Sequence, residues 1–186
     1  SEMCIRDSFY SLQGEGAYTG TPSVFVRFSG CNLHCDFCDT DHLSGEWLSE
    51  KEIIDRASAY PTRHLILTGG EPSLFIDECF IEQLHAAGYR VHIETNGTNP
   101  LPENIDWITC SPKLEQPGGM PLALSHADEL KVVYRGQDLS ALDHFDCRLR
   151  YLQPCSCRNT DEVIAYILEH PEWRLSLQTH KMLSIR

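Results

Sequence analysis

The 186-residue sequence predicts an α/β fold, a truncated (partial) TIM-like barrel of about six parallel strands with fewer helices. Two observations predict it. Short runs of β-branched and apolar residues recur and end in polar or glycine-rich clusters, and segments with helical periodicity lie between several of them. A complete eight-unit barrel usually needs about 250 residues, so this one is expected to be incomplete. Residues 1–186 are expected to form a single domain, because the chain is long enough for one sizeable core.

Each expected element follows from a local pattern. The expected strands are residues 23–28, 64–68, 90–94, 106–110, 129–134 and 148–152. The expected helices are residues 49–60, which open with the capping-box sequence Ser49-Glu-Lys-Glu52, residues 77–87, which Gly88 follows, and residues 160–169. The interval 111–128 holds three prolines and two adjacent glycines, so it is expected to be a loop. Parallel α/β folds bind ligands at the carboxyl ends of their strands, so the polar clusters there should surround one mouth.

The charge balance limits the choice of partners. The formal net charge is -12, from 27 acidic and 15 basic residues. Proteins that bind nucleic acid draw affinity from basic patches, so the composition argues against a nucleic-acid partner. A small anion is still permitted where Arg27, Lys113 or Lys131 converge in a cleft. The sequence shows no signal peptide and no apolar run near the ~18 residues of a membrane span, so we expect no membrane association and a cytoplasmic location.

Three cysteines lie within eight residues, directly after an expected strand: Cys31, Cys35 and Cys38. Together they can surround one metal centre. A structural zinc site would need a fourth ligand, from His34, His42 or the Cys155-Ser-Cys157 segment. A [4Fe–4S] cube on three thiolates leaves one iron open to a small molecule. The spacing alone leaves both interpretations open, and inert buried thiols are a third. The odd total of nine cysteines argues against a disulfide framework.

The cysteine motif carries a family resemblance. Cys-x3-Cys-x2-Cys with Phe37 before its last cysteine resembles the signature of the radical S-adenosylmethionine enzymes. Gly69-Gly70-Glu71-Pro72, after an expected strand, resembles the motif with which that superfamily holds the methionine amino group. An ordinary turn would also account for the second motif, but the two occur in order. The resemblance implies a [4Fe–4S] cluster whose open iron chelates S-adenosylmethionine, and reductive cleavage to a 5′-deoxyadenosyl radical.

A more specific resemblance covers most of the chain. The motifs Leu12-Gln13-Gly14-Glu15-Gly16, Cys38-Asp39-Thr40, Thr68-Gly-Gly-Glu-Pro72, Glu94-Thr-Asn-Gly97, Ser111-Pro112-Lys113, Asp128-Glu-Leu-Lys131, Gln153-Pro154 and Gln178-Thr-His-Lys181 are similar to those of the 7-carboxy-7-deazaguanine synthases. The resemblance implies that 6-carboxy-5,6,7,8-tetrahydropterin becomes 7-carboxy-7-deazaguanine with loss of ammonia, on the route to queuosine-type 7-deazapurines. It also implies magnesium, a flavodoxin or ferredoxin as reductant, and a homodimer.

The same resemblance assigns roles to individual residues. It implies substrate contacts by Leu12, Gln13, Gly14, Glu15, Arg27 and Thr68, cluster ligation by Cys31, Cys35 and Cys38, S-adenosylmethionine contacts by Phe37, Gly70, Glu71, Ser111, Pro112, Lys113 and Gln153, and magnesium ligation by Thr40. Arg27 lies in an apolar strand, where an unpaired guanidinium is costly. Its partner is expected to be a substrate carboxylate or, alternatively, a structural ion pair. His92 is expected to be a core histidine. The resemblance implies that residues 180–181 fold back over the substrate, and a solvated tail is the alternative.

Two other functions stay open at this point. An activase for a glycyl-radical protein shares the cluster motif but would bind a partner protein and show no magnesium-dependent turnover of a pterin. A zinc-stabilised binding module would be colourless, whereas an iron–sulfur protein is brown. Cys155 and Cys157 are expected to be structural thiols. The connection at 41–49 is shorter than in many members of the family, which puts the shape of the reductant surface in doubt.

Overall fold

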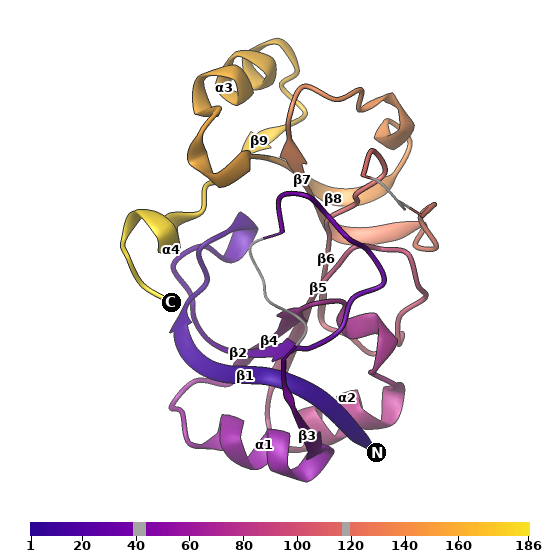
Figure 1. Cartoon of the computed structure of the whole chain (residues 1–186), viewed down its shortest axis with the longest axis vertical. Coiled ribbons are helices and arrows are strands. Elements are labelled where there is room, and N and C mark those ends of the chain that lie inside the picture. Colours follow the sequence, from indigo (N-terminus) through magenta and orange to yellow (C-terminus); the bar gives the residue numbers. More distant parts are fainter. Residues whose placement is uncertain (39–43, 117–119) are drawn as a thin grey trace.

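The computed structural model describes residues 1–38, 44–116 and 120–186, which are organised around one nine-stranded sheet. The strand order is β3-β1-β2-β4-β5-β6-β7-β8-β9, and Figure 1 shows the sheet curling from β3 and β1 to β8 and β9. Neighbours from β2 to β9 are parallel, whereas β1 is antiparallel to β2 and β3. The strands are β1 (Glu2–Leu12), β2 (Pro22–Phe28), β3 (Glu46–Ser49), β4 (His64–Gly69), β5 (Arg90–Thr95), β6 (Trp107–Cys110), β7 (His126–Tyr134), β8 (Asp146–Pro154) and β9 (Arg174–Leu175).

The helices cover the outside of this sheet. In Figure 1, α1 (Glu50–Ser58) and α2 (Glu78–Ala86) lie below it and α3 (Thr160–Glu169) lies at the other end, while α4 (Thr179–Met182) lies beside the end of β1. The capping box at Ser49 and Glu52 forms as expected. Short 3-10 turns are η1 (Gly16–Tyr18), η2 (Pro72–Leu74), η3 (Ser140–Leu142) and η4 (Cys155–Cys157). None of the helices in the described ranges is long and apolar enough to cross a membrane.

The structure confirms the predicted truncated barrel. All six expected strands form, as β2 and β4 to β8, and each is parallel to its neighbour in that series. The three expected helices form as α1, α2 and α3. The observed strands and helices differ from the expected ones only in where they begin and end. The clearest case is strand β7, which starts at His126, inside the expected loop.

Three strands were not predicted, for physical reasons. Strand β1 has a mixed polar sequence, because only Met3 and Ile5 on it are buried, while Phe9 and Leu12 line the cavity described below. Strand β3 is four residues long, and its last residue, Ser49, also caps α1. Strand β9 is an exposed two-residue pair that backbone pairing with β8 defines. An apolar run, the signal used for the other strands, is missing in all three.

The two faces of the parallel strands have different surroundings. On β2, Val24, Val26 and Phe28 are fully buried in the cluster that packs against α1 and α2. The alternate residues, Phe25 and Arg27, are only partly buried and line a cavity on the concave face. A second apolar cluster packs β6, β7 and β8 against α3. Helices α1, α2 and α3 therefore cover one face of the sheet, and the other face is available to a ligand.

A buried group of aromatic and imidazole rings lies between β4, β5 and β6. His64 Nε2 and His92 Nε2 are 2.7 Å apart, and His64 Nδ1 lies 2.8 Å from Ser23 Oγ. The ring of Tyr18 contacts both histidines and Trp107. Burial, with smaller contributions from His64 and Arg90, lowers the pKa of His92 to about 3. His92 is thus a neutral core histidine, as the sequence predicts.

The low pKa of His92 predicts acid sensitivity. In the unfolded chain this imidazole takes a proton near its ordinary pKa of 6.5, whereas in the folded chain it does so only near 3. Its contribution to stability is therefore complete above the unfolded value and is lost as the pH falls toward 3, by at most about 1.4 kcal/mol per pH unit. We expect His92→Gln, which cannot titrate, to lose less free energy of unfolding than the native chain between pH 7 and pH 5 in urea titrations. His126→Gln, which replaces an exposed histidine, should lose as much free energy of unfolding over this pH range as the native chain. Equal losses for all three proteins would contradict the prediction.

Candidate active site

The carboxyl ends of the strands surround a cavity of about 360 Å³. Its wall includes the end of β1, the loop after β2, and residues at the ends of β4, β5, β6, β7 and β8. The site residues expected from the sequence that line it are Cys31, Cys35, Cys38, Leu12, Gln13, Gly14, Glu15, Arg27, Thr68, Phe37, Gly70, Glu71, Ser111, Lys113 and Gln153. Pro112 is buried and does not line it, and Thr40 lies outside the described residues. Distant motifs therefore meet at one mouth, as the parallel topology predicts.

The Gly69-Gly70-Glu71-Pro72 turn lies against the end of β2. Gly70 N–H donates to the Phe28 carbonyl and Glu71 N–H donates to the Gly30 carbonyl, both at 2.9 Å. A Cβ on Gly70 would lie 1.9 Å from the Gly30 carbonyl oxygen, and Gly69 has a φ of +109°. Both positions therefore require glycine. The Glu71 carboxylate accepts from Thr95 Oγ1 at 2.6 Å and from Asn96 N–H at 2.7 Å, so it holds the turn onto the end of β5.

One end of the cavity carries a buried charge network around Lys131 of β7. Its Nζ lies 2.5 Å from Glu15 Oε2 and 3.4 Å from Glu94 Oε1. Burial would lower the pKa of Lys131, but the carboxylates of Glu15, Glu94 and Glu129 raise it. Burial opposes the ionisation of Glu15, but the Lys131 ammonium outweighs it and lowers the pKa of Glu15 to about 2. Lys131 and Glu15 are therefore a charged pair, and the Glu15 carboxylate is an acceptor at this end.

Amides complete that end of the cavity. Gln13 Nε2 donates to Glu94 Oε1 at 3.0 Å, and Gln178 Nε2 donates to Glu15 Oε1 at 3.0 Å. Gln13 Oε1 accepts from the backbone N–H of Glu15 at 3.2 Å. The turn after β1 is thus held in place by side chains from β5, from β7 and from the segment before α4.

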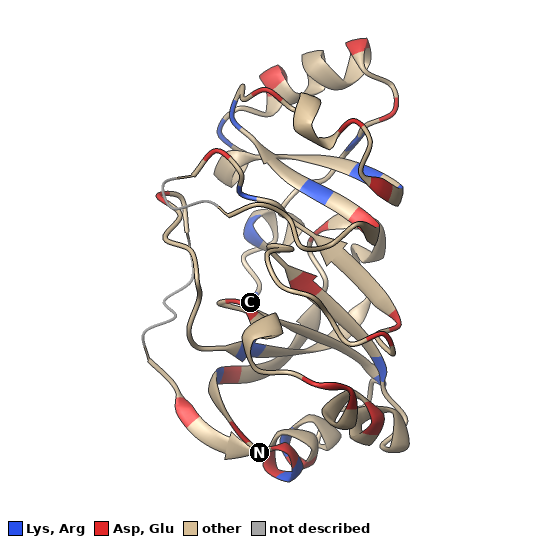
Figure 2. Cartoon of the chain, turned by 90° about the vertical axis from the view of Figure 1, so that its right-hand side faces the viewer, with Lys and Arg blue, Asp and Glu red and all other residues tan. Residues whose placement is uncertain are grey.

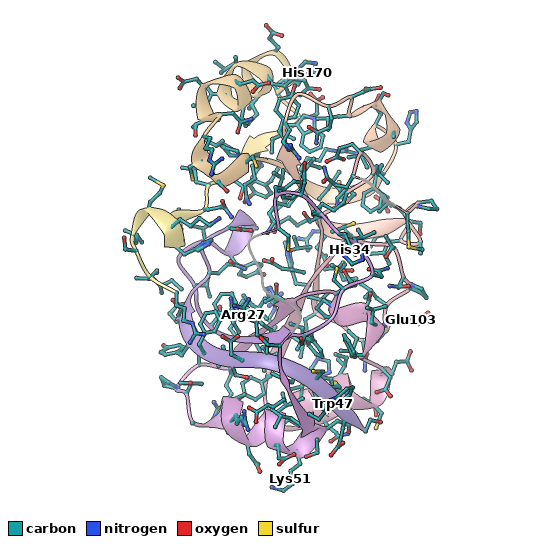
Figure 3. The ribbon with its side chains drawn as sticks, in the orientation of Figure 1. Arg27, His34, Trp47, Lys51, Glu103 and His170 are labelled. Atoms are coloured by element: carbon teal, nitrogen blue, oxygen red, sulfur yellow. The ribbon has the colours of Figure 1, made fainter. Side chains whose placement is uncertain are left out.

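Arg27 lies on another part of the wall, in an ion pair with Asp7 of β1. Its Nε and Nη2 donate to the two Asp7 oxygens at 2.6 and 2.5 Å. Figure 3 shows Arg27 above β1 and β2 in the middle of the molecule, whereas Lys51 lies at the outer edge on α1. Arg186 also pairs with Asp7, and both guanidiniums lie about 5 Å from the Phe9 ring centre, at 5.0 and 4.7 Å. The structural ion pair expected as the alternative is present, and two cations share one carboxylate.

Three residues expected on the S-adenosylmethionine side are Ser111 and Lys113, which follow β6, and Gln153 at the end of β8. Lys113 Nζ donates to the Ser111 carbonyl at 2.5 Å and lies 2.6 Å from Ser111 Oγ. Burial lowers the pKa of Lys113. Gln153 Oε1 accepts from Ser176 Oγ at 2.9 Å, and the same hydroxyl accepts from Gly16 N–H at 2.9 Å. Gln153 is therefore linked to the turn that carries the expected substrate residues.

The segment around α4 folds back onto this turn. The Gly14 carbonyl accepts from Thr179 N–H at 3.0 Å and from Thr179 Oγ1 at 2.9 Å. His180 lies so close that a Cβ on Gly14 would be 2.1 Å from its Nδ1. His180, Lys181 and Arg186 all line the cavity, so the tail forms one of its walls.

Known proteins resemble this chain along nearly its whole length. A 7-carboxy-7-deazaguanine synthase of Bacteroides thetaiotaomicron is 57% identical over 182 residues, which cover 98% of each protein. This chain belongs to the 7-carboxy-7-deazaguanine synthase family. A family member from Bradyrhizobium diazoefficiens is 43% identical over 211 residues, again with 98% of each covered. The crystal structure of QueE from Escherichia coli matches with a TM-score of 0.80 at 32% identity, over 95% of this chain and 94% of that one.

Family membership decides between the alternatives that the cysteine spacing left open. The model of the Radical SAM superfamily matches residues 25–109, which include the three cysteines and the Gly69–Pro72 turn. The radical S-adenosylmethionine interpretation is therefore confirmed in preference to a zinc-stabilised module. The match to the synthases, over nearly the full length, likewise replaces the glycyl-radical activase.

Membership of this superfamily implies a [4Fe–4S] cluster and S-adenosylmethionine, and the thiols fit the cluster. Burial raises the pKa of Cys31 and of Cys35, so a thiolate at either position needs a cation beside it, which a ligated iron supplies. Within the described ranges no three His, Cys, Asp or Glu side chains converge as around a single ion. All three thiols line the same cavity, and a cube places its irons at separate corners, so each thiol can ligate one iron.

Sequence reasoning missed the partner of Arg27. Asp7 faces Arg27 directly in the antiparallel pairing of β1 and β2. The signal was present, because a charged residue on a strand opposite a buried guanidinium is a natural ion-pair partner. It could not be used because β1 itself was not recognised as a strand.

The charge network predicts a large effect of removing Lys131. In Lys131→Met, the carboxylates of Glu15 and Glu94 would lose their buried counter-ion. We expect the free energy of unfolding to fall by about 3–5 kcal/mol in urea titrations. Adding Glu15→Gln should recover part of this loss, because one of the unpaired carboxylates is then neutral.

Lys51→Met is the matched control. Lys51 also pairs with a carboxylate at 2.5 Å, but its side chain is 82% exposed. Its removal should change the free energy of unfolding by less than about 1 kcal/mol. Similar losses for the two lysine variants would show that the Lys131 network is not a buried, coupled unit.

Proposed function

We propose that this protein converts 6-carboxy-5,6,7,8-tetrahydropterin into 7-carboxy-7-deazaguanine with loss of ammonia. One observation carries the proposal: a single cavity joins the three thiols to a carboxylate-rich end and to a guanidinium on its wall. A carboxylated pterin has the matching groups, with N–H donors on its aminopyrimidinone ring and a carboxylate. The activity is the one named for relatives that share nearly the whole chain.

The substrate contacts follow from this match of charges. We propose that Gln13, Glu15 and Glu94 accept hydrogen bonds from the aminopyrimidinone edge, since their oxygens are held by neighbouring donors in fixed directions. Arg27 would bind the substrate carboxylate, with Thr68 beside it in register on β4. Leu12 and Gly14 would flank the ring, because the absence of a Cβ at Gly14 permits close approach.

The opposite side of the cavity would hold S-adenosylmethionine. When bound there, the cluster and S-adenosylmethionine supply the 5′-deoxyadenosyl radical. Gly70 and Glu71 would present the turn to the amino group, and Ser111, Lys113, Gln153 and Phe37 would contact the rest of the molecule. Pro112, which does not line the cavity, would act by shaping the turn between Ser111 and Lys113. The protein's part in the reaction is to hold the two molecules in register and to exclude water.

The remaining assignments rest on the resemblance. Magnesium would be bound by Thr40, which lies outside the described residues, together with substrate oxygens and waters. The reductant would be a flavodoxin or ferredoxin, and the active form a homodimer. We also propose that residues 1–186 act as one domain, which the continuous sheet supports.

An anaerobic assay tests the function. The reconstituted protein receives S-adenosylmethionine, a reductant, magnesium and 6-carboxytetrahydropterin, and mass spectrometry follows 5′-deoxyadenosine and 7-carboxy-7-deazaguanine. We expect both products, with a sharp fall in the deazaguanine when magnesium is removed. Deoxyadenosine without the deazaguanine would refute the substrate assignment while leaving the radical chemistry intact.

Removing the guanidinium at position 27 should weaken substrate binding. A charge-assisted hydrogen bond is worth about 1.5–3 kcal/mol, so Arg27→Gln should raise the KM for the carboxylated pterin about tenfold to a hundredfold. The control is Arg148→Gln, since Arg148 on β8 is 68% exposed and pairs with Asp128. An unchanged KM in Arg27→Gln would limit Arg27 to its ion pair with Asp7.

A further inference from the structure

Cys31 lies between two residues that are attached to the rest of the site. On one side, the Gly30 carbonyl accepts from Glu71 N–H at 2.9 Å, which ties the chain to the Gly69–Pro72 turn. On the other side, the side chain of Asn32 is bonded to the loop after β5. The first cysteine of the motif is therefore fixed from both directions.

The contact of Asn32 is part of a closed ring of three side chains. Asn96 Nδ2 donates to Asn32 Oδ1 at 2.9 Å, and Asn32 Nδ2 donates to Thr98 Oγ1 at 2.8 Å. Thr98 Oγ1 donates to Asn96 Oδ1 at 2.7 Å and so closes the ring. Asn32 Nδ2 also lies 3.7 Å from Met120 Sδ. Each member donates to the next, an arrangement in which hydrogen bonds polarise and strengthen one another.

This Asn32–Asn96–Thr98 ring is continuous with the Gly69–Pro72 turn. The backbone N–H of Asn96 donates to Glu71 Oε2 at 2.7 Å, while Glu71 Oε1 accepts from Thr95 Oγ1. Glu71 is 1% exposed, and Asn96 and Thr98 are each 8% exposed. A closed path of short hydrogen bonds therefore runs from Gly30 through Glu71 and Asn96 to Asn32, and Cys31 completes it.

The contacts described for the segment between Cys35 and Cys38 are partly exposed to solvent. Between them, Asp36 N–H donates to Gln116 Oε1 at 3.3 Å. The Asp36 carboxylate pairs with Arg135 at 2.7 Å, but these two side chains are 57% and 38% exposed. Solvent screens such a pair, so it holds the loop less firmly than the buried ring holds Asn32. The Glu71, Asn96 and Thr98 side chains that hold the two flanks of Cys31 are buried, whereas the Asp36–Arg135 pair is exposed to solvent.

We propose that Asn32, Asn96 and Thr98 are positioning residues that set the Cys31 sulfur relative to the Gly69–Pro72 turn. S-adenosylmethionine must be bound by that turn and by the open iron at the same time, so the separation of the two decides whether it is held correctly. A displacement of about 1 Å at a reacting centre can cost about a hundredfold in rate. The proposal depends on membership of the radical S-adenosylmethionine superfamily and not on the identity of the pterin substrate.

Two substitutions at one position test it. Thr98→Val keeps the shape of the side chain and removes the hydroxyl that closes the ring, whereas Thr98→Ser keeps the hydroxyl. Asn99→Ala is the matched control, because Asn99 lies next in the same loop but donates to Ser73 Oγ instead, at 3.1 Å. The reconstituted proteins are compared by iron content, by thermal unfolding, and by the electron paramagnetic resonance spectrum of the reduced cluster before and after S-adenosylmethionine is added.

We expect every variant to retain its cluster. In Thr98→Val, the spectral change that S-adenosylmethionine causes should differ from the native one or require a higher concentration of S-adenosylmethionine. The rate of 5′-deoxyadenosine formation should fall at least about tenfold, while the KM for the pterin stays unchanged. Thr98→Ser and Asn99→Ala should match the native protein. A native spectral response in Thr98→Val, or the same change in Asn99→Ala, would overturn the proposal.

A second variant keeps the test decisive if Thr98→Val does not load iron. Asn32→Ala removes the partly exposed member of the ring and undergoes the same measurements, with the same expected spectral change. If neither variant retains iron while Thr98→Ser does, the ring maintains the fold of the loop and does not position a loaded cluster, and the proposal is wrong. The spectra require no pterin, so a failed substrate assignment does not affect this result.

Discussion

A buried ammonium is the interaction on which the cavity depends. Lys131 brings one positive charge into the interior of the sheet, and that charge must be balanced there. Glu15 approaches it from the turn after β1 and Glu94 from β5, so three distant parts of the sequence are held at one point. The cost of removing such charges from water offsets much of their attraction, so a buried pair adds little net stability. Here the pairing fixes the turn that carries the expected substrate residues.

The distribution of charge differs between the inside and the outside of the molecule. The chain carries a formal net charge of -12, and Figure 2 shows Lys and Arg segments interspersed with Asp and Glu segments along the ribbon. Inside the cavity the charges are segregated, with carboxylates around Lys131 and two guanidiniums on Asp7. A ligand with donors at one end and an anionic group at the other is bound in one orientation by such a cavity.

The sequence was informative wherever a local pattern was enough. Apolar runs such as residues 64–68 are buried on both faces of a parallel sheet, so their composition alone revealed the strands. The motifs at their ends could be grouped correctly because parallel strands point their carboxyl ends the same way. This rule correctly brought Cys31, Glu71 and Ser111, which follow three different strands, to one cavity.

Features that depend on pairing between distant segments could not be predicted. Strand β1 lacks a continuous apolar run, since only Met3 and Ile5 on it are buried, and without this strand the Asp7–Arg27 pair could not be inferred. The bonds from Asn32 to Asn96 and Thr98 span more than 60 residues of sequence and depend on the exact register of β2, β4 and β5. Local propensity holds no information about such contacts.

The contact between Gly14 and Thr179 has a consequence for the order of folding. It joins residues 165 positions apart, and the bond from Gln178 to Glu15 spans 163. During synthesis the amino-terminal part of a chain is available first, so the apolar cluster of β1 to β5 with α1 and α2 can assemble while the rest is still being made. The last wall of the cavity arrives only when residue 179 leaves the ribosome. A nascent chain of this protein thus has a packed core well before it has a closed binding site.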